Sequence, residues 1–162
     1  MTAIAAAIRR IIELWALAGG LLLLAIVLLN TISLIGNIVA NQPVRGDFEI
    51  VEMGVAVAVF AFLPYCQLTG ANVTADIFTA WAGPRTISFL SVIASIIAVG
   101  FAVLLLWRMW YGLIDYRTYG EMTTVYAIPI WIAFVPILIS LFLLILACLL
   151  TLIDALRGEP VT

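Results

Sequence analysis

The residues of this sequence best placed for chemistry are a short cluster of charges, Arg45, Asp47, Glu49 and Glu52. A spacing of three residues puts Glu49 and Glu52 on one face of a helix, close to its start. Carboxylates in a first helical turn stabilise the helix by about 0.3–1 kcal/mol through its dipole. Alternatively they pair with cations on another subunit, and Arg45 is the nearest cation within the chain. The cluster therefore predicts either helix capping or ion pairs with another subunit.

Few other side chains offer catalytic or ligand chemistry. The chain has no histidine and no lysine, and its two cysteines, Cys66 and Cys148, form no CxxC motif. Thiol redox chemistry and a cysteine–histidine metal site are therefore not expected. No nucleophile–base pair is evident, so we expect no enzyme activity, no metal and no cofactor in this chain. A net charge of −2 without a basic patch argues against nucleic acid as a partner.

The elements that carry these charges can be deduced from where charges do not occur. The seven arginines and nine acidic residues all lie outside four apolar runs. These runs cover residues 14–44, 53–75, 86–107 and 122–153. A helix needs about 20 apolar residues to cross a bilayer core of about 30 Å. Each run is long enough, so the sequence predicts an all-α integral membrane protein with four transmembrane helices.

The whole chain, residues 1–162, is expected to form a single membrane domain, because four spans leave no room for a soluble one. The predicted spans cover about residues 14–39, 50–68, 86–110 and 128–153. Four spans place both termini on the same side of the membrane. That side carries four of the arginines and the other side three, which slightly favours cytoplasmic termini.

Small and uncharged polar residues mark the faces on which the helices are expected to pack. Asn30, Ser33 and Asn37 share one face of the first span, at spacings of three and four residues. Gly54 and Ala58 form a small-xxx-small pair in the second span, which allows close helix approach. Polar groups in lipid usually hydrogen-bond a neighbouring helix. Asn30, Asn37, Gly54 and Ala58 are therefore candidate contacts with a helix of another subunit.

A short amphipathic helix is predicted over about residues 72–82. Apolar residues recur there every four positions up to Trp81, whereas Asn72 and Asp76 fall largely on other faces. Asn72 could cap this helix, which is expected to lie in the membrane interface. The alternative is a frayed extension of the second span.

The longest polar connection is expected between Gly112 and Thr124, where the third span gives way to the fourth. Clustered tryptophan and tyrosine residues mark a membrane–water boundary. Such residues surround the predicted end of the third span at Trp107, Trp110, Tyr111, Tyr116 and Tyr119.

Three motifs of the sequence resemble those of the DctQ family, the small membrane subunits of TRAP (tripartite ATP-independent periplasmic) transporters. The first, RGDFEIVEMG at residues 45–54, is a glutamate-rich start of the second helix after a turn. The second, TGANVTADIF at residues 69–78, is similar to a block with glycine, then histidine or asparagine, then aspartate. The third, AIPIW at residues 127–131, is similar to a proline-and-tryptophan entry to the fourth helix. Length and the four-span layout agree, so the resemblance covers nearly the whole chain.

The sequence departs from the family pattern at two positions. Asn37 stands where family members often carry an arginine, about twelve residues before the first glutamate. An arginine–glutamate pair within the chain is therefore not expected there, which leaves Glu49 and Glu52 freer to pair elsewhere. Asn72 stands in the block where the family often has histidine.

The resemblance implies a non-catalytic scaffold subunit of a secondary transporter in the bacterial inner membrane. Its partner would be a large polytopic subunit that holds the substrate and sodium sites and moves as an elevator. A periplasmic binding protein would deliver an organic acid to this pair. The turns at residues 41–48 and 112–126 would face the periplasm, where Arg117, Tyr119 and Glu121 are candidate contacts. The helix at residues 72–82 would lie at the cytoplasmic face.

Two other functions share parts of this pattern. A small multidrug-type proton antiporter, acting as a homodimer, also has four spans but needs a carboxylate inside the membrane. Glu13 and Glu52 are the candidates for that carboxylate, and both lie near span borders. A membrane enzyme is the third possibility, and no motif of the sequence supports it.

Overall fold

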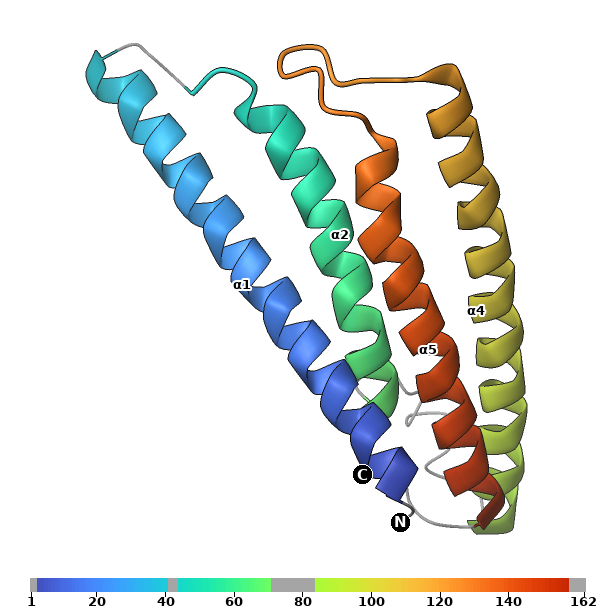
Figure 1. Cartoon of the computed structure of the whole chain (residues 1–162). Helices are drawn as coiled ribbons and strands as arrows, with labels where there is room; N and C mark the ends of the chain where they lie inside the picture. Colours follow the sequence, from blue (N-terminus) through green and yellow to red (C-terminus); the bar gives the residue numbers. More distant parts are fainter. Residues whose placement is uncertain (1–2, 41–43, 71–83, 158–162) are drawn as a thin grey trace.

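The computed structural model of the chain describes residues 3–40, 44–70 and 84–157, and this part is helical apart from its turns and one loop. The four long helices, labelled as in Figure 1, are α1 (Ala3–Ala40), α2 (Asp47–Leu68), α4 (Pro84–Tyr119) and α5 (Trp131–Arg157). The four predicted apolar helices are thus confirmed. The amphipathic helix predicted over residues 72–82, with Asn72, Asp76 and Trp81, lies outside the described residues.

The helices lie side by side in the order α1, α2, α5, α4, which differs from their order in the sequence (Figure 1). α2 packs against α1 on one side and α5 on the other, and α4 packs against α5. α1 is antiparallel to α2 and α4 is antiparallel to α5, whereas the neighbours α2 and α5 run parallel, because both begin at the end of the bundle that holds the α1–α2 turn and the α4–α5 loop. Both termini therefore lie at one end of the bundle and the α1–α2 turn and α4–α5 loop at the other.

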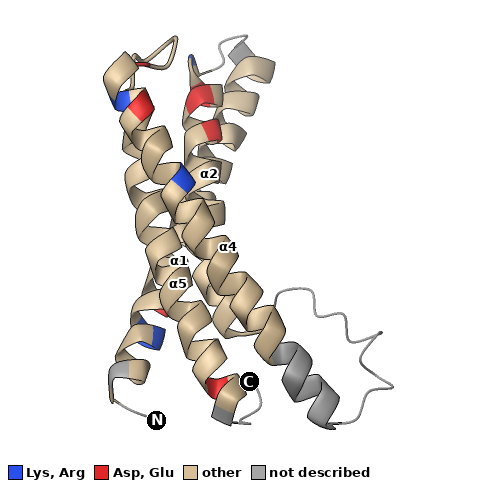
Figure 2. Ribbon diagram, turned by 90° about the vertical axis from the view of Figure 1, so that its right-hand side faces the viewer, with Lys and Arg blue, Asp and Glu red and all other residues tan. Residues whose placement is uncertain are grey.

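All four helices are long and apolar enough to cross a membrane, over Ala5–Val39, Asp47–Leu68, Val92–Tyr119 and Trp131–Leu156. At 1.5 Å per residue, the 22 residues of α2 extend for about 33 Å, close to the thickness of a bilayer core. α2 is the shortest of the four. Most of the charged residues lie toward the two ends of the bundle (Figure 2).

α4 continues well beyond the predicted end of the third span at Trp110, and the polar loop expected from Gly112 is therefore wrong in its first half. The helix ends only at Tyr119. Packing explains the extension, because the ring of Tyr116 lies 5.1 Å from the ring of Phe134 on α5. Gly112 faces the same ring closely enough that a Cβ atom there would meet it at 3.0 Å.

A small apolar core joins α1, α2 and α5 near the chain termini. It contains the buried residues Ile12, Leu68, Leu143 and Ala147. The indole N–H of Trp15 on α1 donates a hydrogen bond of 2.9 Å to the hydroxyl of Ser140 on α5. That hydroxyl in turn donates to the carbonyl of Pro136, 2.8 Å away. The first and last helices are therefore joined by both apolar and polar contacts.

An ion pair links the same two helices at the terminus end of the bundle. Arg9 Nη2 lies 2.7 Å from Asp154 Oδ2, and both side chains are about one quarter exposed. Replacing Asp154 with asparagine is expected to destabilise the fold by about 1–2 kcal/mol. The expected loss of stability lies between two known ranges, because the pair is only partly exposed. An exposed ion pair contributes about 0–1 kcal/mol, and breaking a fully buried pair costs about 3–5 kcal/mol. The midpoint of thermal unfolding of the purified protein in detergent measures the effect.

A matched control is available one turn further along α1. Arg10 and Glu13 form an exposed pair at 3.3 Å. Glu13→Gln should shift the unfolding midpoint much less than Asp154→Asn. Equal midpoints for the two variants would show that the Arg9–Asp154 pair does not hold α1 against α5.

The seam between α1 and α2 is closed by small residues. A Cβ atom on Gly19 would lie 2.8 Å from the Cβ of Ala61, and one on Gly54 would lie 2.6 Å from Ile26 Cδ1. Ala58 is completely buried in the same seam. Small side chains let helix backbones approach closely, which increases van der Waals contact where lipid provides no hydrophobic driving force.

Candidate functional site

The α1–α2 turn is held by a buried hydroxyl near the end of α1. Ser33 is 3% exposed, and its hydroxyl donates a hydrogen bond of 2.5 Å to Asp47 Oδ2 at the start of α2. The hydroxyl oxygen of Ser33 also accepts the backbone N–H of Val44, at 3.2 Å. Asp47 therefore already has a hydrogen-bond partner within the chain. The sequence placed Ser33 on a packing face but gave no sign that its partner would be a carboxylate.

The α4–α5 loop, residues 120–130, folds on itself around Thr123. Its backbone N–H donates to the carbonyl of Ile128 at 2.9 Å, and its hydroxyl accepts the N–H of Ile128 at 3.0 Å. The carbonyl of Thr123 accepts the N–H of Ala127, a residue with a φ of 51°. This tight turn leaves the N–H groups of Val125 and Tyr126 pointing away from the loop's own acceptors.

Glu49 on α2 accepts both of these N–H groups. Its Oε1 lies 2.7 Å from the nitrogen of Val125 and its Oε2 lies 3.2 Å from that of Tyr126. Successive backbone N–H groups form a concavity that favours an anion, here a carboxylate of the same chain. Hydrogen bonds to a charged acceptor are stronger than neutral ones. Glu49 therefore docks the α4–α5 loop on the start of α2.

Gly46 brings the two connections into direct contact. It precedes α2 with a φ of 71°, in the left-handed region that favours glycine. A Cβ atom at this position would lie only 2.6 Å from the ring of Tyr126. We call residues 44–49 and 120–130 together the paired loops.

Several large or charged side chains project from the paired loops and the adjoining helix end. Arg117, in the last turn of α4, lies over the ring of Trp131 at 5.7 Å, a cation–π contact that closes the α4–α5 connection. The other candidate residues at this end are exposed: Arg45, Tyr119 and Glu121. Phe48 is 74% exposed beside them. This surface is accessible to a second protein.

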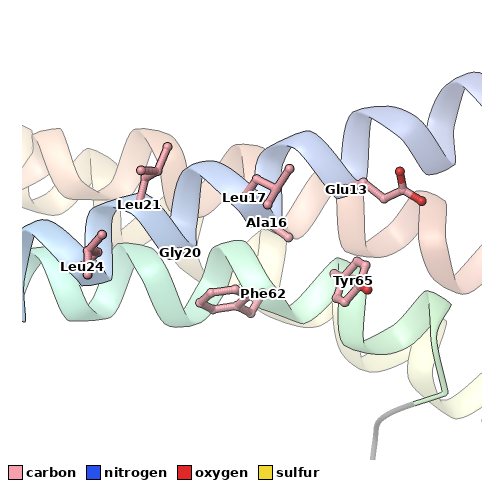
Figure 3. Close-up of a pocket in the computed structure, with 8 residues that line it drawn as sticks. All are labelled: Glu13, Ala16, Leu17, Gly20, Leu21, Leu24, Phe62 and Tyr65. Carbon is pink, nitrogen blue, oxygen red and sulfur yellow. The ribbon is translucent and has the colours of Figure 1, made fainter.

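A groove of about 590 Å³ follows the α1–α2 seam toward the terminus end (Figure 3). Leucines of α1 and Phe62 of α2 line it, and Glu13 and Tyr65 lie near one of its ends. Because Glu13 already faces Arg10, the groove holds no free acid–base pair. Its chemistry is that of an apolar surface open to lipid.

A second groove, of about 490 Å³, lies over α5 between α2 and α4 and reaches the α4–α5 loop. Its side chains include Met53 and Phe60 of α2, Met109 of α4 and Phe134 of α5. Glu52 also lines it. In contrast to Glu49, Glu52 is exposed and has no hydrogen bond or ion pair with any residue that the structure describes.

The residues predicted from the sequence to contact another subunit fall into two groups in the structure, packed within the chain or exposed. Gly54 and Ala58 lie in the α1–α2 seam, against α1 of the same chain. Asn30 and Asn37 are exposed on α1. Sequence reasoning missed the Arg9–Asp154 pair, although opposite charges at the same border of the first and last spans were a usable signal. No sequence signal could show that backbone N–H groups near residue 125 would meet Glu49.

Within residues 3–40, 44–70 and 84–157, no group of three or more histidine, cysteine or acidic side chains is placed to hold a metal ion. The geometry instead presents apolar surfaces, two docked connections and a small number of charges near the helix ends.

Comparison with known protein families identifies the family of this chain. The family model described as "Tripartite ATP-independent periplasmic transporters, DctQ component" matches residues 26–158, which is most of the chain. No curated protein and no solved structure matches the chain. The match covers α2, α4 and α5 and more than a third of α1. The chain therefore belongs to the DctQ family of TRAP transporters, and it is a multi-pass membrane component of a transporter rather than an enzyme.

Proposed function

We propose that this chain is the non-catalytic scaffold partner of a large, sodium-coupled elevator subunit. The pair would import an organic acid that a periplasmic binding protein delivers. The observation that carries the proposal is membership of the DctQ family together with four apolar helices whose central turns are uncharged. A charge at a helix centre costs about 2.5–3.5 kcal/mol on insertion scales, so chains keep one mainly where it has a function. A scaffold has no such need.

The proposed orientation puts both termini in the cytoplasm and the paired loops in the periplasm. The arginine distribution supports this direction, with four on the terminus side and three on the other. In this orientation Arg117, Tyr119 and Glu121 would face the binding protein. Docking of the α4–α5 loop by Glu49 supports such a role, because a fixed loop loses less conformational entropy on binding than a free one.

Affinity purification and reconstitution test the proposed function. A tag on this chain, expressed with the genes that flank it, should bring down a large polytopic protein. Vesicles containing both subunits should take up an organic acid only when sodium and the binding protein are present. Vesicles with either subunit alone serve as controls and should not. Sodium-independent transport by this chain alone would contradict the proposal.

A further inference from the structure

We infer that the groove over α5 is the seat of a transmembrane helix of another polypeptide, and that this helix carries an arginine or lysine that pairs with Glu52. The inference rests on the proposed function, because we assign this helix to the large subunit named there. It goes further by selecting one face of the bundle and one carboxylate.

The first argument is that the two glutamates of α2 differ in their hydrogen-bond partners. Glu49 has both carboxylate oxygens occupied by backbone N–H groups of Val125 and Tyr126. Glu52 lies one turn further along α2, is exposed and lines the groove. Because Glu52 has no partner among the described residues, it is the carboxylate of the cluster that remains available to a second protein.

The second argument is the depth of Glu52. α2 is about 33 Å long, so it must use nearly its whole length to cross a core of about 30 Å. Glu52 is the sixth residue of this helix and therefore lies about 8 Å from its start. This places the backbone of Glu52 just inside the loop-side border of the membrane core. A charge beside an apolar groove at that depth is stabilised by a cation that arrives with the groove's occupant.

The third argument is the lining of the groove. Met53 and Met109 face it from two different helices, with Phe60 and Phe134 beside them. Methionine side chains adapt to the shape of an apolar partner, and such grooves receive helices. On α5, Ala133 and Ile137 contribute to the lining and are already buried. The groove therefore has room for side chains of a helix that lies across α2 and α4, in the manner of knobs in holes.

A lipid is the less suitable occupant. An acyl chain could fill the apolar part of the groove, but the phosphate of a lipid headgroup would repel the carboxylate of Glu52, and the ammonium of a zwitterionic lipid stays tethered beside that phosphate. A helix with an arginine or lysine satisfies both the apolar lining and the charge. The groove along the α1–α2 seam differs in this respect, since its carboxylate, Glu13, already has Arg10.

Charge reversal tests the pairing in the intact complex. Glu52→Arg should reduce the amount of large subunit that copurifies by about tenfold, equivalent to about 1.4 kcal/mol. Glu13→Arg, the same change of charge outside the groove, is the control and should leave the yield unchanged. Exchange of the paired cation of the large subunit for glutamate should restore copurification of the Glu52→Arg variant.

Site-specific photo-crosslinking tests the groove without changing its charge. A photoreactive amino acid in place of Met53 or Met109 should form adducts with the large subunit in native membranes. Leu104, exposed on another face of α4, is the control position and should form far fewer. Adducts confined to lipid or to a second copy of this chain would overturn the inference.

The outcomes for the proposed function and for this inference are separable. If the wild-type chain copurifies with the large subunit and Glu52→Arg does so equally well, the inference is wrong and the proposed function stands. If the wild-type chain brings down no large subunit, both are wrong.

Discussion

Replacing Gly19 with alanine is expected to force α1 and α2 apart and to destabilise the bundle by about 1–3 kcal/mol. The added Cβ would lie 2.8 Å from the Cβ of Ala61, and Ala58 O lies 3.5 Å away. Neither neighbour is the end of a flexible side chain, so the backbones themselves must move. The midpoint of thermal unfolding in detergent should fall. The amount of partner subunit that copurifies should fall too if the partner binds the packed helices α1 and α2.

Gly20 provides the matched control for this substitution. Among the described residues, a Cβ there would meet only Phe62 Cζ, at an ordinary contact distance of 3.8 Å. Gly20→Ala makes the same chemical change in the same helix, and it should be neutral or stabilise by up to about 1 kcal/mol through helix propensity. If both variants unfold at the same temperature, close packing at Gly19 is not what holds α1 on α2.

Replacing Glu49 with alanine is expected to release the α4–α5 loop from α2. Val125 and Tyr126 would lose the acceptor of their N–H groups. Hydrogen bonds to a charged acceptor are stronger than neutral ones, so these two N–H groups should open to solvent more often without the carboxylate. The amides of Val125 and Tyr126 should therefore exchange with deuterium about tenfold faster, as measured by hydrogen–deuterium exchange. The N–H of Thr123 should remain protected, because its acceptor, the carbonyl of Ile128, lies within the loop.

Glu52→Ala is the control for loop release. It removes a carboxylate one turn along the same helix that forms no hydrogen bond or ion pair with any described residue of the loop. Exchange at Val125 and Tyr126 should be unchanged in this variant. Unchanged exchange in Glu49→Ala as well would mean that the loop keeps its position without the carboxylate.

Taken together, the two glutamates have different expected phenotypes. Loss of Glu49 should alter the loop end of the bundle and any contact made by the paired loops. Loss of Glu52 should leave the chain's own structure intact and weaken its assembly with another subunit. The sequence treats them as one pair on one helical face, and only their surroundings distinguish them.

The helical architecture was largely predictable from the sequence. The absence of charge from four long runs predicts four apolar helices, because an unpaired charge in lipid is costly and a spanning backbone must satisfy its own hydrogen bonds. The boundaries were less predictable. Residues 112–119 contain polar and charged residues that suggested a loop, yet contact of Gly112 and Tyr116 with Phe134 keeps them helical.

The sequence by itself also determined that the charges cluster at the helix ends, since this follows from composition along the chain. The tertiary structure alone decided which of these charged side chains have a hydrogen-bond or ion-pair partner within the chain. Val125 lies 76 residues from Glu49 in the chain, and Asp154 lies 145 residues from Arg9. Such pairings depend on the helix order α1, α2, α5, α4 and on the path of a folded loop. The Glu49 contact leaves no signal in the sequence, because backbone N–H groups are present at every residue except proline. The opposite charges of Arg9 and Asp154 are visible in the sequence, but they meet only because α1 and α5 pack together at the terminus end.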